Sequence, residues 1–166
     1  VYYVYKHETN LTTEENKMRK DLMNIFEEAY AGAQFARLAY KAAANGDERE
    51  TARELYKEAT AKIKDLTKIE KCVWDAYAGA KDRGNEYLDF DGVIQAELVE
   101  DLVKCLRDCG IKAFTFSSTW SSTIETAWLF QKAGCNLTGL VELNSSVKAC
   151  MSDEFEKVPG YLFNIN

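Results

Sequence analysis

Residues 12–83 read TTEENKMRKDLMNIFEEAYAGAQFARLAYKAAANGDERETARELYKEATAKIKDLTKIEKCVWDAYAGAKDR and contain no proline. Because proline breaks helix interiors, its absence allows this charged stretch to be helical along nearly its whole length. The single proline of the chain is Pro159. The strongest interruption is Asn45-Gly46, a pair that tolerates the positive φ of a helix end. We therefore expect two long helices that lie antiparallel across a short turn.

Apolar or small residues recur at helical spacing along both arms of this stretch. They fall every three or four residues and form one face on each arm. Thr12 and Glu15 predict a capping box at the start of the first arm. Gly84-Asn85 ends the second arm, and the two faces are expected to pair as in an antiparallel coiled coil. The faces comprise Met18, Leu22, Ile25, Ala29, Ala33, Ala36 and Tyr40, then Ala52, Leu55, Ala59, Ile63, Leu66, Val73, Tyr77 and Ala80.

The segments outside this stretch have the patterns of a small sheet with helices. Val1–Lys6 is rich in β-branched and aromatic residues, which favours a strand. Beyond Gly92, helix and strand patterns alternate, and this order suggests neighbouring parallel strands joined by a helical crossover. Ser122 and Glu125 predict a capping box for the second helix. We expect helices over Val93–Cys109 and from Ser122 to Gly134, and strands over Lys112–Ser117, Leu137–Leu143 and Tyr161–Ile165.

Together these elements predict a protein of the α+β or mixed α/β class. A long antiparallel helical hairpin over residues 12–84 would accompany a small three- to four-stranded sheet with two further helices. Residues 1–7 and 91–166 would build the sheet unit, and residues 1–166 would form a single domain. With 166 residues, of which 46% are hydrophobic, the chain has enough apolar material for a core.

Charge and hydropathy exclude several classes of function. The net charge of −6 at pH 7 leaves no basic domain of the kind that neutralises phosphates. Nucleic acid is therefore expected only as part of a larger complex. No apolar run is long enough to cross a bilayer, and Val1–Lys6 lacks the order of a signal peptide. We expect a cytoplasmic protein that does not contact a membrane.

Cysteine and histidine usage argues against metal or nucleophilic chemistry. Cys105 and Cys109 share a helix face, but zinc takes four ligands and no second pair lies nearby. His7 is the only imidazole, so a serine nucleophile would lack a base. Asp89-Phe90-Asp91-Gly92 resembles part of a calcium loop without the closing Glu, and helix N-capping by Asp91 accounts for it better. We expect buried, reduced thiols and identify no catalytic residue, metal ligand or cofactor.

A stripe of basic residues follows the second arm opposite its apolar face. At 100° per residue its members lie within about 80° of one another. The stripe is either a surface for an acidic partner or a nucleic-acid backbone, or the solvated side of an amphipathic helix. We take it as the first candidate for a partner-binding surface. It comprises Arg53, Lys57, Lys64, Lys68 and Lys71.

Phe35 and Leu38 lie on the polar side of the first arm, near Lys20 and Glu27 on the helical wheel. Large apolar side chains in that position have to meet a covering surface. Packing within the chain is the first expectation, and a partner protein or a second copy of the chain is the next. We include both residues in the candidate partner-binding surface.

A hydroxyl-rich segment lies between a predicted strand and a predicted helix. A helix N-terminus attracts anions, and hydroxyl groups add donors, so the segment could hold a phosphate or a carboxylate. It contains neither the glycine nor the lysine of phosphate-binding loops, and capping or turn formation explains the same residues without a ligand. The candidate anion-binding residues are Ser117, Ser118, Thr119, Trp120 and Ser121.

Two runs after residue 109 resemble the late strand–helix–strand of acetyl-CoA-dependent N-acetyltransferases. They are Gly110–Ser117 and Thr126–Gly134. In that family the helix ends in a Lys-x-Gly-aromatic turn, whereas Cys135 replaces the aromatic residue here. The family's glycine-rich pyrophosphate loop has no counterpart between Asp91 and Asp108. The resemblance therefore implies a fold rather than an acetyl-CoA site.

The C-terminal part also resembles small uncharacterised accessory proteins of phages and conjugative elements in anaerobic bacteria. The residues that carry this resemblance are Gly110–Thr115, Trp120-Ser121 and Gly139–Glu142. The resemblance implies an accessory role, and inhibition of a host anti-phage defence complex is one such role.

Two functions are compatible with this sequence. The first is a non-catalytic protein-binding module, an inhibitor or adaptor encoded by a mobile element, which binds through the helical hairpin. The alternative is a small-molecule, nucleotide or acyl-CoA binder related to a degenerate transferase, which would use the hydroxyl-rich segment. The lack of a convincing acid–base, nucleophile or metal set favours the first function.

Overall fold

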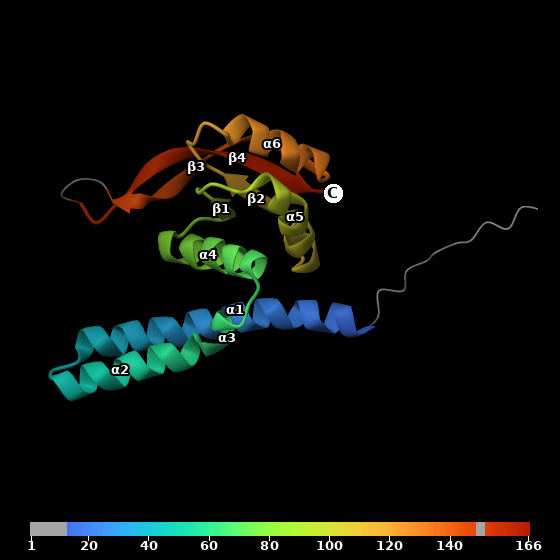
Figure 1. The fold of residues 1–166 in the computed structure, drawn as a ribbon. Helices are drawn as coiled ribbons and strands as arrows, with labels where there is room; N and C mark the ends of the chain where they lie inside the picture. The colour runs from blue at the N-terminus through green and yellow to red at the C-terminus, as the bar shows by residue number, and fades with distance from the viewer. Residues whose placement is uncertain (1–12, 149–151) are drawn as a thin grey trace, which may run out of the picture.

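The computed structural model describes residues 13–148 and 152–166, and the described part has an α+β fold (Figure 1). It contains six α-helices, one 3₁₀-helix and a four-stranded sheet. The predicted fold class is therefore confirmed. The predicted strand at Val1–Lys6, the Thr12 cap, His7 and Cys150 lie outside the described residues. In the described ranges, none of the helices has both the length and the apolar character that crossing a membrane requires.

The helical hairpin consists of α1 (Thr13–Ala42) and α2 (Gly46–Ala59), joined at the predicted Asn45-Gly46 turn. The Asn45 side chain caps α2 by accepting a hydrogen bond from the Glu48 N–H at 3.0 Å. The Glu48 carboxylate accepts in return from the Ala44 N–H at 2.7 Å. The turn thus satisfies donors that a helix start leaves open. In Figure 1 the closed end of the hairpin extends past α4.

The second arm is not one helix, which corrects the expected continuous stretch to Arg83. Helix α2 ends at Ala59, and a short α3 (Ala61–Lys64) precedes α4 (Lys68–Arg83). The physical cause is a capping box: Thr67 Oγ1 accepts from the Glu70 N–H, and Glu70 Oε2 accepts from the Thr67 N–H at 2.8 Å. The chain therefore changes direction at Thr67, and α4 packs against the sheet as well as against α1.

The sheet has the strand order β1-β2-β4-β3. Strand β4 is antiparallel to both of its neighbours, and β1 is parallel to β2. The strands expected to be parallel neighbours, β2 and β3, are separated by β4, because the chain returns through the middle of the sheet. The two strands that do pair in parallel are β1 and β2. Strand β1 was not predicted. The strands are β1 (Leu88–Phe90), β2 (Ala113–Phe116), β3 (Cys135–Lys148) and β4 (Phe155–Ile165).

Three helices surround this sheet, and together with it they form what we call the α/β unit, residues 68–166. Figure 1 shows α4 and α6 (Thr123–Lys132) on opposite sides of the sheet. Helix α5 (Val99–Asp108), preceded by the 3₁₀-helix η1 (Ala96–Leu98), is the crossover between β1 and β2 and packs against both α4 and α6.

The core of the α/β unit is a cluster of phenylalanine rings. Phe114 of β2 stacks on Phe163 of β4 with centroids 5.5 Å apart and an interplanar angle of 13°. Phe130 of α6 meets the Phe114 ring edge-on at 4.9 Å, and all three side chains are fully buried. Such ring pairs add to the large area that aromatic side chains bury. This cluster fixes α6 against the strands.

A second aromatic cluster attaches the hairpin to the α/β unit. Phe26 of α1 is fully buried, and its ring centroid lies 5.5 Å from that of Trp74 and 5.6 Å from that of Tyr77 on α4. Tyr30 meets Tyr77 edge-on at 6.2 Å. Because α4 also contacts β1 and α5, it lies between the hairpin and the sheet.

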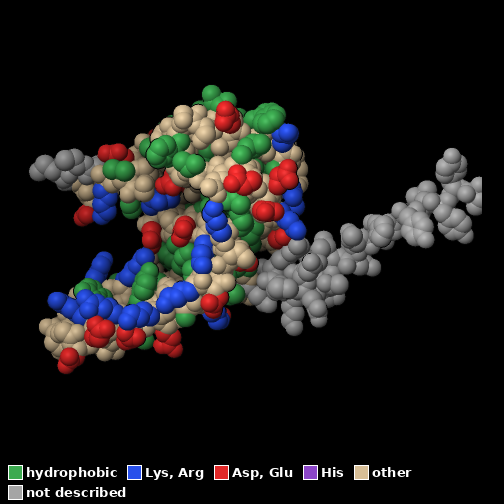
Figure 2. Space-filling view, viewed as in Figure 1, with side chains coloured by type: hydrophobic (Ala, Val, Ile, Leu, Met, Phe, Trp, Pro, Cys, Tyr) green, Lys and Arg blue, Asp and Glu red, His purple; other side chains and the backbone are tan. Residues whose placement is uncertain are grey.

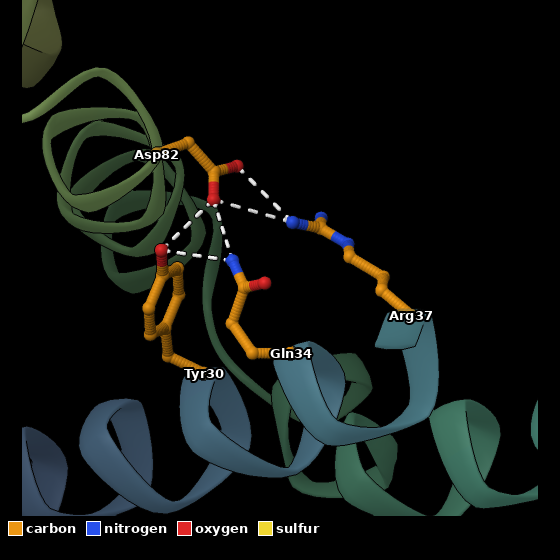
Figure 3. A network of polar contacts seen from close by, with 4 residues as sticks. All are labelled: Tyr30, Gln34, Arg37 and Asp82. Carbon is orange, nitrogen blue, oxygen red and sulfur yellow. Dashed lines mark hydrogen bonds and ion pairs between the residues drawn. The ribbon is translucent and has the colours of Figure 1, made fainter. Parts of the chain in front are cut away.

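Beside this cluster, Asp82 of α4 accepts hydrogen bonds from three side chains of α1 (Figure 3). Tyr30 Oη and Gln34 Nε2 each lie 2.9 Å from Asp82 Oδ1, and Arg37 Nη1 lies 3.2 Å from both carboxylate oxygens. The groups are exposed, so the contact contributes at most about 1 kcal/mol. Its consequence is geometric, since it shows that this side of α1 faces the α/β unit.

A side chain closes the free edge of β3 at one point. Asn85, just after α4, donates from Nδ2 to the carbonyl oxygen of Asn144 and accepts from the Asn144 N–H, both at 2.9 Å. Asn144 Nδ2 donates to the carbonyl oxygen of Arg83 at 2.6 Å. The amide of Asn85 thus takes the hydrogen bonds that a further strand would make, and it ties the end of α4 to the sheet.

Truncating the phenylalanine core should cost far more than truncating an exposed ring. We expect Phe163→Ala to lower the free energy of unfolding by about 3–5 kcal/mol, because it removes a fully buried ring and leaves a cavity. Phe35→Ala is the control, since its side chain is 65% exposed and the change should stay within about 0.5 kcal/mol. Urea denaturation of both variants measures the difference. Equal losses would contradict the assigned core.

The hairpin depends on a close helix contact at Gly32. A Cβ at this position would lie 2.6 Å from Ala59 Cβ on α2, which is too close without a backbone shift. We expect Gly32→Ala to destabilise the protein by about 1–3 kcal/mol, although alanine favours helices. Gly46→Ala, where no atom lies within 4 Å, should be neutral or stabilising by up to about 1 kcal/mol. A Gly32→Ala variant as stable as Gly46→Ala in thermal denaturation would refute the contact.

Candidate functional site

A groove runs between α1 and α2 on the hairpin, and we call it the tyrosine groove. Its volume is about 370 Å³. Two alanines form its floor, two tyrosines stand over it, and four basic residues form its rim. The lining residues are Ala36, Ala52, Tyr40, Tyr56, Arg37, Lys41, Arg53 and Lys57.

Small residues and rings together create this groove. Ala36 and Ala52 are each 2% exposed and let the two helices approach closely. Tyr40 and Tyr56 extend beyond them and keep about two fifths of their surface exposed. The Arg53 guanidinium lies 5.6 Å from the Tyr40 ring centroid, within cation–π range. The groove therefore presents apolar surface that is bordered directly by positive charge.

The cations of the groove are only partly neutralised. Arg53 pairs with Glu50 at 2.9 Å and Lys57 with Glu54 at 2.6 Å, each one helical turn away. These hydrogen bonds raise the pKa values of Arg53 and Lys57. Lys41, in contrast, forms no ion pair with any residue of the described ranges. All of these charges face water, where ion pairs contribute little to stability and exchange readily for a partner's carboxylates.

The groove opens toward the α/β unit. Arg37, on its rim, is the residue that Asp82 of α4 holds. Figure 2 shows Lys and Arg side chains along the side of the hairpin that faces the α/β unit, Asp and Glu along the opposite side, and an open notch between the hairpin and that unit. The charges of the hairpin are thus segregated between two sides.

The structure divides the predicted basic stripe into separate parts. Arg53 and Lys57 belong to the tyrosine groove, whereas Lys64 lies on α3. Lys68 and Lys71 begin α4 and donate to Gln95 Oε1 at 2.6 Å and to the Lys64 carbonyl oxygen at 2.7 Å. The five residues would share one face only on a continuous helix, and the chain breaks at Thr67.

Phe35 and Leu38 are not covered by any part of the chain that the structure describes. Their side chains are 65% and 64% exposed, so the expected packing within the chain is wrong. Phe35 is roughly 160° from Arg37 around α1, at 100° per residue. Neither Phe35 nor Leu38 lines the tyrosine groove, and the two residues form a separate exposed apolar surface.

The predicted anion-binding segment is largely engaged in its own turn. Ser117 Oγ donates to Asp89 Oδ2 at 2.6 Å, and Ser118 Oγ accepts from the Trp120 N–H at 3.4 Å. Thr119 and Ser121 are exposed, as is Trp120 at 60%. The predicted capping box is wrong, because the Ser122 side chain makes no capping hydrogen bond at the start of α6. The Ser117 hydroxyl, which was expected to bind an anion, therefore already donates to the carboxylate of Asp89.

Asp89 is a buried carboxylate that was not among the predicted site residues. It is 5% exposed and accepts hydrogen bonds from Thr115 Oγ1 at 2.8 Å and Ser117 Oγ at 2.6 Å. Burial raises the pKa of Asp89, the two hydroxyls lower it, and the neighbouring Asp91 raises it. The sequence feature that could have pointed to Asp89 is the Asp89–Gly92 run. Asp91 itself does not cap a helix, since the next helix begins only at Ala96.

The cysteines provide no site of their own. The described ranges contain four cysteines, of which Cys135 is buried and the others are half-buried. The hydrogen bond with Cys109, followed by burial, raises the pKa of the Cys105 thiol well above its usual range. Over the same ranges, no group of three or more His, Cys, Asp or Glu side chains could hold a metal ion.

The raised pKa of Asp89 predicts how its removal changes stability with pH. A folded pKa above the unfolded value of about 3.9 means that the folded state binds the proton more tightly. Stability from this group is therefore present at low pH and lost as pH rises through the folded pKa. We expect the stability of Asp89→Asn relative to the wild-type protein to increase across this window, because Asn cannot ionise.

Chemical denaturation between pH 4 and pH 8 measures this difference. Asp101→Asn is the matched control, because it removes an exposed carboxylate of α5. The pKa of Asp75 is also raised, so Asp75 changes stability with pH in the same direction. Because the wild type and both variants contain Asp75, its contribution cancels when their stabilities are compared. A difference between Asp89→Asn and wild type that does not change with pH would contradict the assignment.

Comparison with known proteins concerns mainly the α/β unit. No curated protein and no solved structure matches the chain. Residues 72–165, from α4 to the end of β4, match the family described as "Domain of unknown function (DUF7698)". The match excludes the hairpin formed by α1 and α2. Since it covers more than half of the 166 residues, the chain belongs to this family.

Proposed function

We propose that this protein is a non-catalytic protein-binding module that holds an acidic segment of a partner protein in the tyrosine groove. The observation that carries the proposal is that apolar floor, tyrosine rings and cationic rim occur in one groove. Tyrosine and arginine are the residue types that most often dominate binding energy at protein interfaces. Alanines at the floor leave room for a side chain from the partner.

The dimensions and charges of the groove indicate the kind of segment that fits. A volume of about 370 Å³ accommodates one or two apolar side chains rather than a whole element. Carboxylates on either side of that anchor would meet Arg37, Lys41, Arg53 and Lys57. The expected ligand is therefore a helix or extended segment with an apolar anchor between Asp or Glu residues. Complementary charge of this kind favours association and selects the partner.

The notch beside the groove supports a partner of more than peptide size. The groove opens toward the α/β unit, so a bound segment would lie between the hairpin and that unit (Figure 2). A partner entering there could bury surface on both, which is how a standard-size interface of about 1,600 Å² would be reached. The exposed Phe35 and Leu38 are a second partner surface in this proposal, available to a different protein or to a second copy of the chain.

The biological setting is part of the proposal and rests on resemblance alone. The C-terminal runs that resemble accessory proteins of phages and conjugative elements suggest a protein encoded by a mobile element. Its partner would then be a component of a host defence complex, which the module inhibits by occupying an acidic segment. Nucleic acid would be contacted only through that complex.

Charge reversal on the groove rim tests the proposal. We expect Arg53→Glu with Lys57→Glu to weaken binding of the partner roughly tenfold or more, since two attractive charges become repulsive. The fold should survive, because exposed charges contribute little to stability. The partner is first captured from host lysate by the wild-type protein and purified, and its dissociation constant is then measured by calorimetry for each variant.

The matched control is Lys104→Glu with Lys112→Glu, which makes the same charge change at exposed positions of the α/β unit. It should retain wild-type affinity. A third variant, Phe35→Ser with Leu38→Ser, tests the outer surface of α1. Wild-type affinity in the groove variant together with loss in this third variant would move the interface to the outer surface and overturn the proposal.

A further inference from the structure

A second, larger pocket lies in the α/β unit, between α4 and the segment that leaves β1. Its volume is about 570 Å³, which is within the usual range of small-molecule sites. We call it the charged pocket. Phe90 is part of its wall, with Val93 and Ile94 beside it. Its ionisable lining residues are Lys68, Lys71, Asp75, Arg83, Asp89 and Asp91, together with the Cys72 thiol.

The charged pocket occupies a position in the fold where ligands commonly bind. Strands β1 and β2 are parallel, and α5 is their crossover. The chain leaves the carboxyl end of β1 at Phe90, and residues 91–94 border the pocket. In open α/β sheets, ligands bind in crevices outside the carboxyl ends of parallel strands, and this pocket lies at the corresponding end of β1. The location is independent of the hairpin and of the tyrosine groove.

Charges of both signs line this pocket without neutralising one another. In the described ranges, Asp75 and Asp91 form neither an ion pair nor a side-chain hydrogen bond. Lys68 and Lys71 donate only to neutral oxygens, those of the Gln95 side chain and the Lys64 backbone. Arg83 forms no ion pair with a described residue, and its buried Nε has no hydrogen-bond partner there. Lys68, Asp75 and Asp91 are exposed to water, so a ligand that enters the pocket can pair with them.

The order of these charges along α4 gives the pocket one basic end and one acidic end. Lys68 and Lys71 are in its first turn, and Asp75 follows one turn later. Asp89 and Asp91, at the end of β1, add two more carboxylates to the wall opposite α4. Burial raises the pKa of Asp75, although the residue as a whole is exposed. Among the described lining residues, Arg83 is the cation that acts on Asp89.

We propose that the charged pocket binds a small zwitterion with a cationic side chain, such as a basic amino acid. Its carboxylate lies against Lys68 and Lys71 at the start of α4. Its side-chain ammonium or guanidinium group lies between Asp75 and Asp91, over the buried Asp89. The methylene groups between the two ends contact Phe90 and Ile94. A ligand of this kind satisfies both ends of the pocket at once, which a simple anion or a simple cation does not.

Thermal denaturation of the full chain with defined probes tests this site. The probes are L-arginine, L-lysine, agmatine, L-glutamate and AMP. We expect L-arginine or L-lysine to raise Tm by about 5–10 °C at one hundred times its dissociation constant. Agmatine, which lacks the carboxylate, should bind at least tenfold more weakly than L-arginine, because the contact with the two lysines is lost. L-Glutamate and AMP should leave Tm unchanged.

Variants then locate the binding. Asp75→Asn with Asp91→Asn removes two carboxylates of the pocket and should weaken L-arginine binding at least tenfold in calorimetry. Asp101→Asn with Glu100→Gln removes two exposed carboxylates at the start of α5, outside the pocket, and should leave the affinity unchanged. Both residues changed in the first variant are exposed, so it is expected to fold.

Three results would overturn the proposal. One is no Tm shift with either basic amino acid. Another is a shift that persists unchanged in the Asp75→Asn, Asp91→Asn variant. The third is a shift with AMP or L-glutamate equal to that with L-arginine, which would mean that the lysine end alone binds anions. None of these results depends on whether the tyrosine groove binds a partner protein.

Discussion

The structure depends on α4 being packed on two sides. Toward α1 it presents Trp74 and Tyr77, which contact the buried Phe26, and on another side it contacts β1 and α5. Because α4 is shared in this way, the hairpin and the α/β unit hold a defined relative position. The same helix supplies Asp82 to the contact with α1 and one wall of the charged pocket. Both proposed binding sites therefore depend on where this helix lies.

The hairpin turn could be predicted from sequence because its determinants are local. Asn45-Gly46 and the flanking apolar spacing are enough to specify two antiparallel helices. The break before α4 was also readable, since Thr67 and Glu70 form a capping box, but continuous apolar spacing on both sides of it favoured a single helix. The three residues of β1 and the insertion of β4 between β2 and β3 were not predictable, because short strands carry little pattern and strand order is set by contacts between distant residues.

For the candidate sites too, features of a single helix were predictable and features that need two elements were not. Arg53 and Lys57 were found because a charged stripe is a property of one helix. The contribution of Tyr40 and Tyr56 was missed, since a groove exists only when Ala36 of one helix faces Ala52 of another. Asp89 was missed for a related reason: its partner Thr115 is 26 residues away and becomes its neighbour only when β1 pairs with β2. Chemistry that arises within one element is visible in sequence, and chemistry between elements is not.

The contact between Asn85 and Asn144 has a consequence for how the molecule behaves in concentrated solution. Strand β3 is long, and among the strands that the structure describes it pairs only with β4, so its other edge offers backbone groups to any extended chain. At Asn144 those groups are already occupied by an amide side chain from the end of α4. A strand from another molecule could not continue its hydrogen bonds past that residue without displacing Asn85. The asparagine thus interrupts the template along which sheets of separate molecules would fuse into aggregates.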